Sequence, residues 1–379
     1  MNSETQVQKI QLVDLHAQYA TIRSELEREI SSLIDSCEFI QGKRVKEFES
    51  AFAKSHNVKF GVGVSNGTTA VELALKSIGI KPGDEVITST NTFFATVEAI
   101  HNIGAVPILC DIDPETYLIN ANQIESKTTP KTKALLPVHI YGQMADMTTI
   151  NKIAKSHNLK VVEDAAQAHY AKYEGLYPGQ SSNAACFSFY PGKNLGAMGD
   201  AGAVITNNEQ TYALASKLRN HGRKEGSKYE HDVFGYNMRM DEIQAAVLKI
   251  KLKYIAQWTE TRRKNAKIYN EYLKDFPGVQ TPKEDTNATH VYHLYVVKLD
   301  LKYSRDNVLS EMKKEGINCG IHYQVPIHLQ PAFQSQYGKV DLPIAAQSAQ
   351  SIISLPMYAE LSQEQIEHVT KTLKKVLSK

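Results

Sequence analysis

Cysteine is scarce in this chain of 379 residues: only Cys37, Cys110, Cys186 and Cys319 occur, far apart and without a Cys-x-x-Cys pair. That spacing excludes the common cysteine-based zinc motifs and a disulfide framework, so buried free thiols are the simpler interpretation. No stretch approaches the ~20 consecutive apolar residues of a membrane-spanning helix. Residues 1–15 lack the basic start and apolar core of a secretory signal. We therefore expect a soluble cytoplasmic protein with no metal site.

An excess of charge of either sign is also missing. Lys and Arg total 43 against 41 Asp and Glu, a formal net charge of +2. This balance argues against a nucleic-acid or membrane surface built on bulk electrostatics, so an anionic ligand would have to be bound by local groups. No internal repeat and no low-complexity segment interrupts the chain, and 42% of its residues are hydrophobic. We expect one large domain and a smaller one.

The first part of the chain predicts an α/β domain with a mainly parallel sheet. Between Phe60 and Thr206, short apolar runs alternate with segments of helical spacing, as in sheets that are covered by helices. The candidate strands are 59–64, 85–89, 106–110, 134–139, 159–163, 185–189 and 202–206. The candidate helices between them include 68–78, 94–103 and 147–156.

The pattern changes after Met240. Residues 241–275 are rich in Ala, Lys, Ile and Leu and contain few helix breakers, which predicts one or two long helices that leave the first domain. Beyond them, 290–299 has the pattern of a strand, and 305–315 and 362–377 have that of helices. We expect a large α/β domain over residues 1–250 and a smaller α+β domain over 251–379.

The most informative stretch runs from Phe187 to Gly202, where a strand breaks at Pro191 and leads Lys193 into a glycine-rich turn. A lysine that forms a Schiff base and then moves protons must be neutral when it acts, so its pKa must fall from ~10.4 towards ~7. A surface lysine in a flexible turn is the ordinary alternative. A phosphate-binding P-loop is excluded, because Phe187 and Asn194 occupy positions that the motif reserves for Gly and for Ser or Thr.

Two further stretches fit a site for an anionic cofactor around this lysine. Asp164 ends the apolar strand 159–163, at the edge where open α/β sheets bind ligands, and could keep a pyridine nitrogen protonated. Capping of the following turn is the alternative role. Residues 63–70 (Gly-Val-Ser-Asn-Gly-Thr-Thr-Ala) read as a strand, a small-residue turn and a helix start that could bind a phosphate, with Ser188 as a further donor. As a dinucleotide fingerprint the stretch is defective, because Asn66 replaces the third glycine.

Six motifs in this order resemble the DegT/DnrJ/EryC1/StrS family of sugar aminotransferases, over nearly the whole chain. They are Ser-Asn-Gly-Thr-Thr-Ala70, Thr-Asn-Thr-Phe-Phe-Ala-Thr96, Glu-Asp-Ala-Ala-Gln167, Phe-Ser-Phe-Tyr-Pro-Gly-Lys-Asn-Leu-Gly196, Leu-Arg-Asn-His-Gly222 and Gly-Tyr-Asn-Met-Arg-Met240. The resemblance implies the fold type I architecture of pyridoxal-phosphate (PLP) enzymes, usually a homodimer with active sites at the subunit interface.

The resemblance also assigns residues to roles. Lys193 would be the Schiff-base lysine, Asp164 would pair with the pyridine nitrogen, and Gln167 would contact the ring hydroxyl. The cofactor phosphate would bind Gly67, Thr68 and Ser188, together with Asn237 from the neighbouring subunit. Phe93 would stack on the ring, with a plain core phenylalanine as the alternative. The substrate contacts, each with an ordinary interface or surface contact as the alternative, would be Tyr190, Arg219, Tyr229, His322 and Tyr323.

The implied reaction moves the amino group of L-glutamate through PLP to a ketone carbon of a nucleotide-linked sugar. The motif around Tyr190 resembles members that aminate C3 of dTDP-linked 3-keto-6-deoxyhexoses, whereas many C4-specific members carry histidine there. A C4 aminotransferase of a UDP- or GDP-linked keto sugar, and an inactive scaffold or regulatory homologue, remain as alternatives. Lys193 argues against the related dehydratases, in which histidine replaces the lysine.

Overall fold

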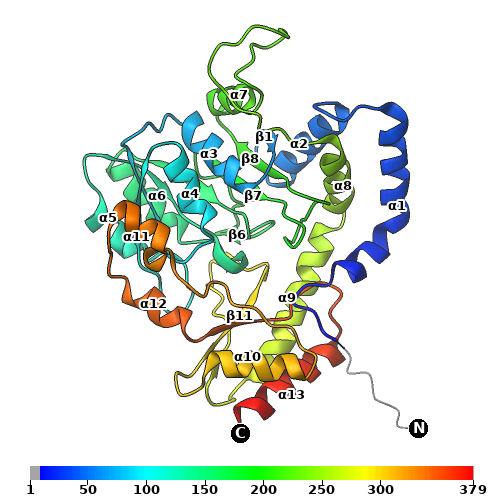
Figure 1. The fold of residues 1–379 in the computed structure, drawn as a ribbon, viewed down its shortest axis with the longest axis vertical. Coiled ribbons are helices and arrows are strands. Elements are labelled where there is room, and N and C mark those ends of the chain that lie inside the picture. The colour runs from blue at the N-terminus through cyan, green and yellow to red at the C-terminus, as the bar shows by residue number, and fades with distance from the viewer. Residues whose placement is uncertain (1–8, 379) are drawn as a thin grey trace.

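The computed structural model describes residues 9–378. Its centre is a seven-stranded sheet in the order β1-β8-β7-β5-β4-β2-β3 (Figure 1). Only β8 runs against the other strands, because it pairs antiparallel with both β1 and β7 while the remaining neighbours are parallel. The strands are β1 (Phe60–Val64), β2 (Glu85–Ser89), β3 (Val106–Cys110), β4 (Thr132–Leu136), β5 (Lys160–Asp164), β7 (Ala184–Ser188) and β8 (Gly202–Thr206). This confirms the mainly parallel sheet.

Helices cover both faces of the sheet, so its strands are almost continuously apolar. Successive side chains of a strand point to opposite faces. Ala184 and Cys186 therefore join one buried cluster, whereas Ala185 and Phe187 join the other. The helices that supply the first cluster are α3 (Gly67–Ser77), α4 (Ala95–Asn102) and α7 (Glu209–Leu218). The helices that supply the second are α2 (Lys43–Ser55), α6 (Met147–Ser156) and α8 (Glu242–Leu252).

The carboxyl ends of the parallel strands meet at one edge of the sheet, which positions the site. Asp164 is the last residue of β5 and Ser188 the last residue of β7. Because β8 is antiparallel to both β1 and β7, β1 runs in the same direction as β7 and its helix α3 begins at this edge. The polar residues that follow β1, β2, β4, β5 and β7 are thus neighbours in space although they span more than a hundred residues of sequence.

A second buried core lies at the other end of the molecule. The 19-residue helix α9 (Ile255–Leu273) leads from the large sheet into it (Figure 1), and Tyr269 of α9 stacks on Tyr295 at 4.6 Å between ring centroids. The other elements of this core are α10 (Arg305–Lys314), α13 (Gln363–Leu377) and the antiparallel sheet of β9 (Val279–Gln280), β11 (Tyr295–Leu299) and β12 (Ile352–Leu355). We propose that the two domains divide near residue 250. The start of the described chain also belongs to the second domain, because Ile10 packs in the second core and pairs with Ile317.

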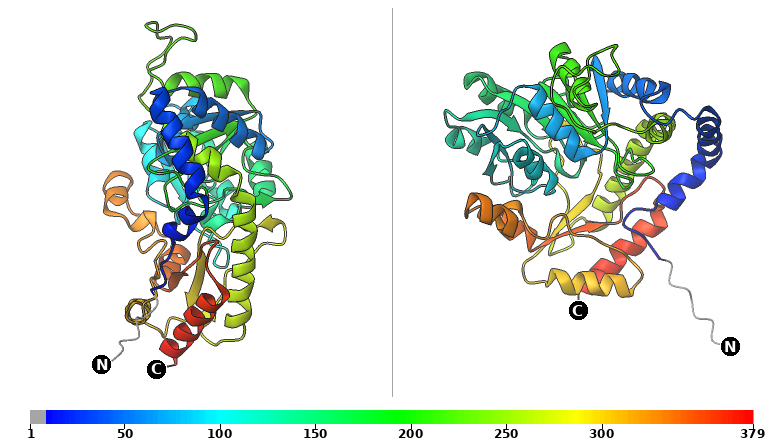
Figure 2. Two further views of the ribbon diagram at one scale, coloured as in Figure 1. Left: turned by 90° about the vertical axis from the view of Figure 1, so that its right-hand side faces the viewer. Right: turned by 45° about the horizontal axis from the view of Figure 1, so that its top comes forward.

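Several short or peripheral elements complete the fold. Helix α1 (Leu15–Ser36) runs along the outside of α8, as Figure 2 also shows. The remaining elements are α5 (Ile124–Lys127), α11 (Pro331–Tyr337), α12 (Pro343–Ala349), β6 (Lys172–Tyr173), β10 (Ala288–Thr289) and the 3-10 turns η1 (Ala121–Gln123), η2 (Ile140–Gly142) and η3 (Ile327–Leu329). Within residues 9–378, no helix combines the length and the apolar composition needed to cross a bilayer.

The strand expected over 290–299 is wrong in its first half. Strand β11 begins only at Tyr295, and the preceding residues bond to the large domain instead: the Val291 amide donates to Gly142 O at 2.9 Å and the Leu294 amide to Tyr141 O at 3.2 Å. An apolar, β-branched run looks the same whether its backbone pairs with a strand or with a turn. The structure therefore shows a bridge between the two domains here.

Candidate active site

The turn that carries Lys193 is closed on both sides by hydrogen bonds. The Lys193 amide donates to Tyr190 O at 2.8 Å, and the Ala197 amide donates to Phe189 O at 2.8 Å. Gly196 is required within this turn, because a Cβ there would lie 2.2 Å from the carbonyl oxygen of Pro191. The chain is thus held in one conformation directly after β7, and the lysine is fixed at its base.

The amine of Lys193 is prepared to act as a neutral group. Burial lowers the pKa of Lys193 to about 8, and the nearby carboxylate of Asp164 opposes this by favouring the charged form. The residue as a whole is only partly covered. An amine with a pKa close to neutral pH can both accept and release a proton.

Asp164 is buried and its orientation is fixed by two donors. Its Oδ2 accepts from the Thr96 hydroxyl at 2.8 Å, and its Oδ1 accepts from the Ala166 amide at 3.1 Å. The Thr96 hydroxyl is itself paired with that of Thr92 at 2.7 Å. These contacts fix the orientation of the carboxylate at the edge of the sheet. The expected position of Asp164 at the end of a parallel strand is confirmed.

Gln167 lies buried beside Asp164 and joins the two domains. Its Oε1 accepts from the Tyr141 amide at 2.7 Å, and its Nε2 donates to the Tyr323 hydroxyl at 3.0 Å. Because the carbonyl end of the side-chain amide is bound to a backbone donor, the NH₂ end must face the cleft. The sequence motif could not show that a main-chain group sets this orientation.

The candidate phosphate site lies between the start of α3 and the end of β7. Asn66 caps α3 by accepting from the Thr69 amide at 2.9 Å, and the Thr69 hydroxyl completes the capping box. Gly67, the first helical residue, contacts Ser188, since a Cβ on Gly67 would lie 2.7 Å from Ser188 Cβ. The first turn, Gly67 and Thr68, is only partly covered and has free backbone donors, which suits an anion.

Phe93, His322 and Tyr323 complete one wall of the cleft. The Phe93 side chain is 60% exposed and its ring centroid lies 5.9 Å from that of Tyr323. His322 Nδ1 lies 2.7 Å from the Ser354 hydroxyl, and burial together with the charge of Lys193 lowers its pKa to about 4. The exposed ring is available for stacking and the imidazole is neutral, and the roles of these residues toward a cofactor and substrate stay predictions.

Three candidate residues lie apart from this cluster. The Arg219 guanidinium is bound by the Glu49 carboxylate and donates to Gly63 O at 2.6 Å, so the structure gives it a structural ion pair. Tyr229 is 81% exposed on segment 220–236, whose two limbs project beyond α7 at the top of Figure 1. Asn237 lies at the base of that segment, where it is exposed and pairs with Asn220 through its backbone. A fourth candidate, Tyr190, is exposed at the start of the turn that carries Lys193.

Several residues near Lys193 escaped the sequence interpretation. His169 packs between Phe187 and Phe189, and burial and the charge of Lys193 hold its pKa well below the usual value. His293 Nδ1 lies 3.2 Å from Asn194 Oδ1, and burial lowers its pKa in the same way. Both imidazoles are neutral and leave the pocket without competing cations. No periodicity or motif marks them; only the three-dimensional structure brings them to the lysine.

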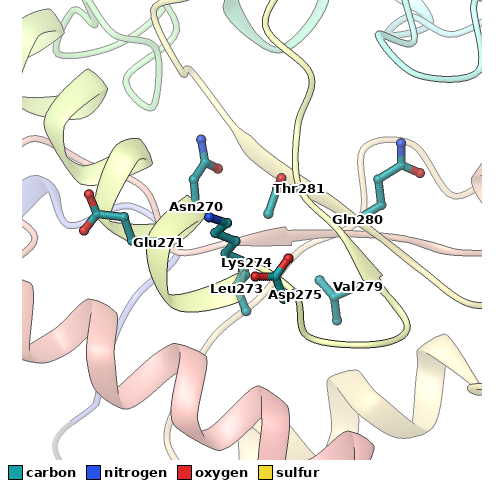
Figure 3. Close-up of a pocket in the computed structure, with 8 residues that line it drawn as sticks. All are labelled: Asn270, Glu271, Leu273, Lys274, Asp275, Val279, Gln280 and Thr281. Atoms are coloured by element: carbon teal, nitrogen blue, oxygen red, sulfur yellow. The ribbon is translucent and has the colours of Figure 1, made fainter.

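Other features of the described surface do not compete with this site. A hollow of about 530 Å³ lies at the end of α9, and in Figure 3 polar side chains from α9 and from the segment around β9 surround it. None of the residues expected from the sequence lines it; its lining is Asn270, Glu271, Leu273, Lys274, Asp275, Val279, Gln280 and Thr281. No group of three or more His, Cys, Asp or Glu side chains in residues 9–378 is arranged to hold a metal ion.

Similarity to known proteins agrees with this geometry. The model of the DegT/DnrJ/EryC1/StrS aminotransferase family matches residues 20–374. The chain is 44% identical to a pleiotropic regulatory protein of Geobacillus stearothermophilus, over 96% of this chain and 97% of that one. It is 39% identical to a UDP-N-acetyl-3-dehydro-α-D-glucosamine 3-aminotransferase of Acidithiobacillus ferrooxidans (98% and 99% covered). It is 38% identical to a dTDP-3-amino-3,4,6-trideoxy-α-D-glucose transaminase of Streptomyces venezuelae (96% and 95% covered).

Solved structures share the fold closely. A crystal structure of DesV from S. venezuelae in complex with a ketimine intermediate has a TM-score of 0.93 at 37% identity, covering 97% of this chain and 98% of that one. A Bacillus subtilis protein, NtdA, solved with the cofactor PMP, has a TM-score of 0.89 at 29% identity, covering 97% and 83%. The chain therefore belongs to the DegT/DnrJ/EryC1/StrS aminotransferase family, a family of PLP-dependent enzymes.

Proposed function

We propose that this protein transfers the amino group of L-glutamate, by way of PLP, to the keto carbon of a nucleotide-linked sugar, with C3 of a dTDP-linked keto-6-deoxyhexose as the favoured acceptor. The observation that supports this most is the convergence of the Lys193 amine, the Asp164 carboxylate and the Gln167 amide at the edge of the sheet where the partly exposed first turn of α3 also lies. Each group matches one functional group of PLP.

The residues present fit the cofactor. The partly open start of α3, with Gly67 packed on Ser188, supplies backbone and hydroxyl donors for its phosphate. The oriented carboxylate of Asp164 would keep the pyridine nitrogen protonated, and the NH₂ of Gln167 would face the ring hydroxyl. Phe93 would cover the ring. When bound, PLP supplies an electron-withdrawing ring that accepts the electron pair left when a Cα–H bond is broken.

Lys193 moves the proton at its Nζ. With a pKa of about 8, a substantial fraction of the amine is neutral near pH 7.5 and can accept the proton that leaves the substrate carbon. The resulting ammonium is stabilised by Asp164, which favours the charged form. The neutral His169, His293 and His322 do not compete for this proton, because burial lowers the pKa of each.

Two observations favour C3 over C4. The names of the two aminotransferase relatives above both place the nitrogen at carbon 3 of the sugar. In this chain Tyr190, 60% exposed at the mouth of the Lys193 turn, occupies the position where many C4-specific members carry histidine. The nucleotide is less constrained, since one relative is named for a UDP sugar and the other for a dTDP sugar. The resemblance around Tyr190 is the reason that we favour dTDP.

A purely regulatory role is the second candidate, because one relative is called a pleiotropic regulatory protein. A retired enzyme would have no physical reason to keep a buried amine with a lowered pKa beside an oriented carboxylate. Location in the cytoplasm stays a prediction from the sequence.

The test is a transfer assay with ¹⁵N-labelled L-glutamate and the PLP-loaded protein. Mass spectrometry of the nucleotide sugar after incubation with a dTDP-linked 3-keto-6-deoxyhexose should show the label, and a UDP- or GDP-linked 4-keto sugar should react far more slowly. A faster reaction with either 4-keto sugar would overturn the C3 assignment. Absence of label on every keto sugar, with no 2-oxoglutarate formed, would favour the regulatory role.

We also propose a homodimer with shared sites. The projecting segment 220–236 is braced at its base, where the Asp232 amide donates to Gly222 O at 2.9 Å and Asp232 pairs with Lys217 at 2.6 Å. It nevertheless presents Phe234 to solvent entirely unburied. A projecting arm with an exposed aromatic side chain at its base is typical of a surface that a second protein chain covers. On this proposal a second copy accepts the arm, and Asn237 at its base reaches the neighbouring phosphate site.

Mixing inactive variants tests the shared site. Lys193→Ala and Asn237→Asp are each expected to be nearly inactive, and dimers formed from one of each contain one intact site. Equal mixing should therefore restore about a quarter of the wild-type activity. Sedimentation should show the dimer throughout. A mixture as inactive as its components would contradict the donation of Asn237 across the interface.

A further inference from the structure

Tyr141 is a buried tyrosine that contacts both domains at the edge of the proposed cofactor site. Its side chain is 3% exposed, and it lies in η2, after β4, with a φ of 60° that a non-glycine residue rarely adopts. Its hydroxyl donates to His322 O of the second domain and accepts from Asn91 Nδ2 at 3.2 Å. Both hydrogen-bonding capacities of the hydroxyl are thus used.

The contacts of Tyr141 close a ring of hydrogen bonds. Its amide donates to Gln167 Oε1 at 2.7 Å, and Gln167 Nε2 donates to the Tyr323 hydroxyl at 3.0 Å. Tyr323 is joined by its peptide bond to His322, whose carbonyl accepts from the Tyr141 hydroxyl. One residue therefore fixes Gln167 through its backbone and the His322–Tyr323 segment through its side chain.

Within this ring one proton is left without an acceptor. The Tyr323 hydroxyl accepts from Gln167, and among residues 9–378 no group accepts the hydroxyl proton of Tyr323 itself. Burial raises the pKa of Tyr323 above its usual value, so the proton stays on the oxygen. The Phe93 ring lies beside Tyr323, with 5.9 Å between the two ring centroids. Tyr323 is only partly covered, so a donor of this kind is available to an oxygen atom of a ligand beside Gln167.

We propose that Tyr141 is a positioning residue: its hydroxyl holds the His322–Tyr323 segment so that the Tyr323 hydroxyl donates to a substrate oxygen beside Gln167. This inference rests on the proposed aminotransferase function. Tyr141 itself touches neither Lys193 nor the reacting carbon. Because Tyr323 stands beside the group that would face the ring hydroxyl, it serves L-glutamate and the keto sugar in turn, and both half-reactions depend on Tyr141.

The variant Tyr141→Phe removes only the bridging hydroxyl and keeps the ring and the amide that orients Gln167. The absorption spectrum of the PLP-loaded enzyme should therefore match that of the wild type. In single-turnover titrations with L-glutamate, the apparent Kd should rise about 10-fold, because the donor is no longer held in place. Tyr323→Phe, which removes the donor itself, should raise it at least as much. The apparent Kd for the keto sugar should rise in parallel.

The double variant separates positioning from a structural role. If Tyr141 acts through Tyr323, then Tyr141→Phe has no further effect on the glutamate Kd in a Tyr323→Phe background. The matched control is Tyr117→Phe, a buried neighbour whose ring lies 5.8 Å from that of Tyr141 and should leave the Kd unchanged. If Tyr141→Phe does not fold, Asn91→Ala removes the other bond to the same hydroxyl and should weaken glutamate binding by a smaller factor.

Two results would overturn the inference while leaving the aminotransferase function intact. One is a 10-fold loss from Tyr141→Phe that persists in the Tyr323→Phe background. The other is a lower Tm of Tyr141→Phe with an unchanged Kd for glutamate. If the spectrum of the wild-type enzyme does not respond to L-glutamate at all, the proposed function fails and the role of Tyr141 fails with it.

Discussion

Two lysines of this molecule have lowered pKa values, in different surroundings. Burial lowers the pKa of Lys193 to about 8 and that of Lys251 to about 7. Lys193 is partly exposed at the edge of the sheet, beside Asp164. Lys251, near the end of α8, is 0% exposed and its Nζ lies 4.8 Å from the ring centroid of Tyr19 and 5.9 Å from that of Trp258.

The difference shows that a lowered lysine pKa does not by itself identify an active site. The Lys251 amine has no hydrogen-bond partner among the described residues, and neither carboxylate oxygen of the nearby Glu360 has one. Aromatic rings and helices α1, α8 and α9 cover this pair, so no substrate can reach it. Lys193 is instead partly exposed, beside the Asp164 carboxylate at the edge of the sheet where Gln167 and the start of α3 also lie. Access and neighbouring chemistry, more than the pKa, distinguish the two lysines.

The largest difference is expected when each lysine is replaced by a residue without an amine. Lys193→Ala should lower kcat of amino transfer by roughly 10⁴-fold or more, because the group that moves the proton is lost. Lys251→Met should retain kcat within about 3-fold, because it removes a buried charge that faces Tyr19 and Trp258 rather than Asp164. Steady-state kinetics with L-glutamate checks both. A similar loss in the two variants would erase the distinction between these sites.

The next effect tests whether the carboxylate beside Lys193 does more than balance its charge. Asp164→Asn keeps the size of the side chain but cannot keep a pyridine nitrogen protonated, so kcat should fall by about 10²–10³-fold. In the apoenzyme the pKa of Lys193 should fall further, since Asp164 raises it. Glu360→Gln, which changes the carboxylate near Lys251, is the matched control and should leave kcat unaffected. A variant Asp164→Asn with wild-type kcat would contradict the assigned role.

A smaller effect concerns stability. The pKa of Lys251 is about 7 in the folded chain and 10.5 in the unfolded one, so the unfolded chain binds more protons between these pH values and the free energy of unfolding rises with pH. The gain from pH 7 to pH 10 attributable to Lys251 is about 2–4 kcal/mol. Glu360, whose pKa burial raises, contributes the opposite slope at lower pH.

The comparison of thermal melts isolates this contribution. The difference in Tm between Lys251→Met and the wild type should be largest below pH 7 and shrink as the pH approaches 10, because the buried ammonium is costly only while it is charged. Groups that do not interact with Lys251 titrate identically in both proteins and cancel, whereas the charge of Lys251 lowers the pKa of Glu360, so the contribution of that group differs at low pH. A Tm difference that does not change with pH would show that the amine of Lys251 is neutral or hydrated throughout.

Local patterns predicted the large domain well. Strands β2 and β3 and helix α6 begin and end where the apolar periodicity places them, and β1, β5 and β7 are within a residue of the prediction. These elements are buried on one or two faces of a regular sheet, so their spacing is visible in the sequence. Strand β8 has the predicted bounds, 202–206, but its reversed direction was not predicted, because strand direction depends on pairing rather than on composition. The outer helices α1 and α2 were not predicted.

The site was predicted in part, for a physical reason. Lys193, Asp164 and Ser188 follow strands, and the ends of parallel strands converge, so their proximity follows from the fold class. Tyr141 carries no such signal: its importance depends on a hydroxyl that reaches the second domain and on a backbone amide that orients Gln167. Arg219 is bound by Glu49 in the structure, which the sequence could not show, and its assignment to the substrate stays a prediction.

The most direct test of the account identifies which lysine binds the cofactor. The PLP-loaded protein is reduced with borohydride, which fixes the cofactor to the amine that holds it, and the digested peptides are analysed by mass spectrometry. The account predicts the label on Lys193 and none on Lys251, with no label in Lys193→Ala. A label on Lys251 or on another lysine of the wild-type protein, or no label at all, would contradict the proposal that Lys193 is the reactive amine.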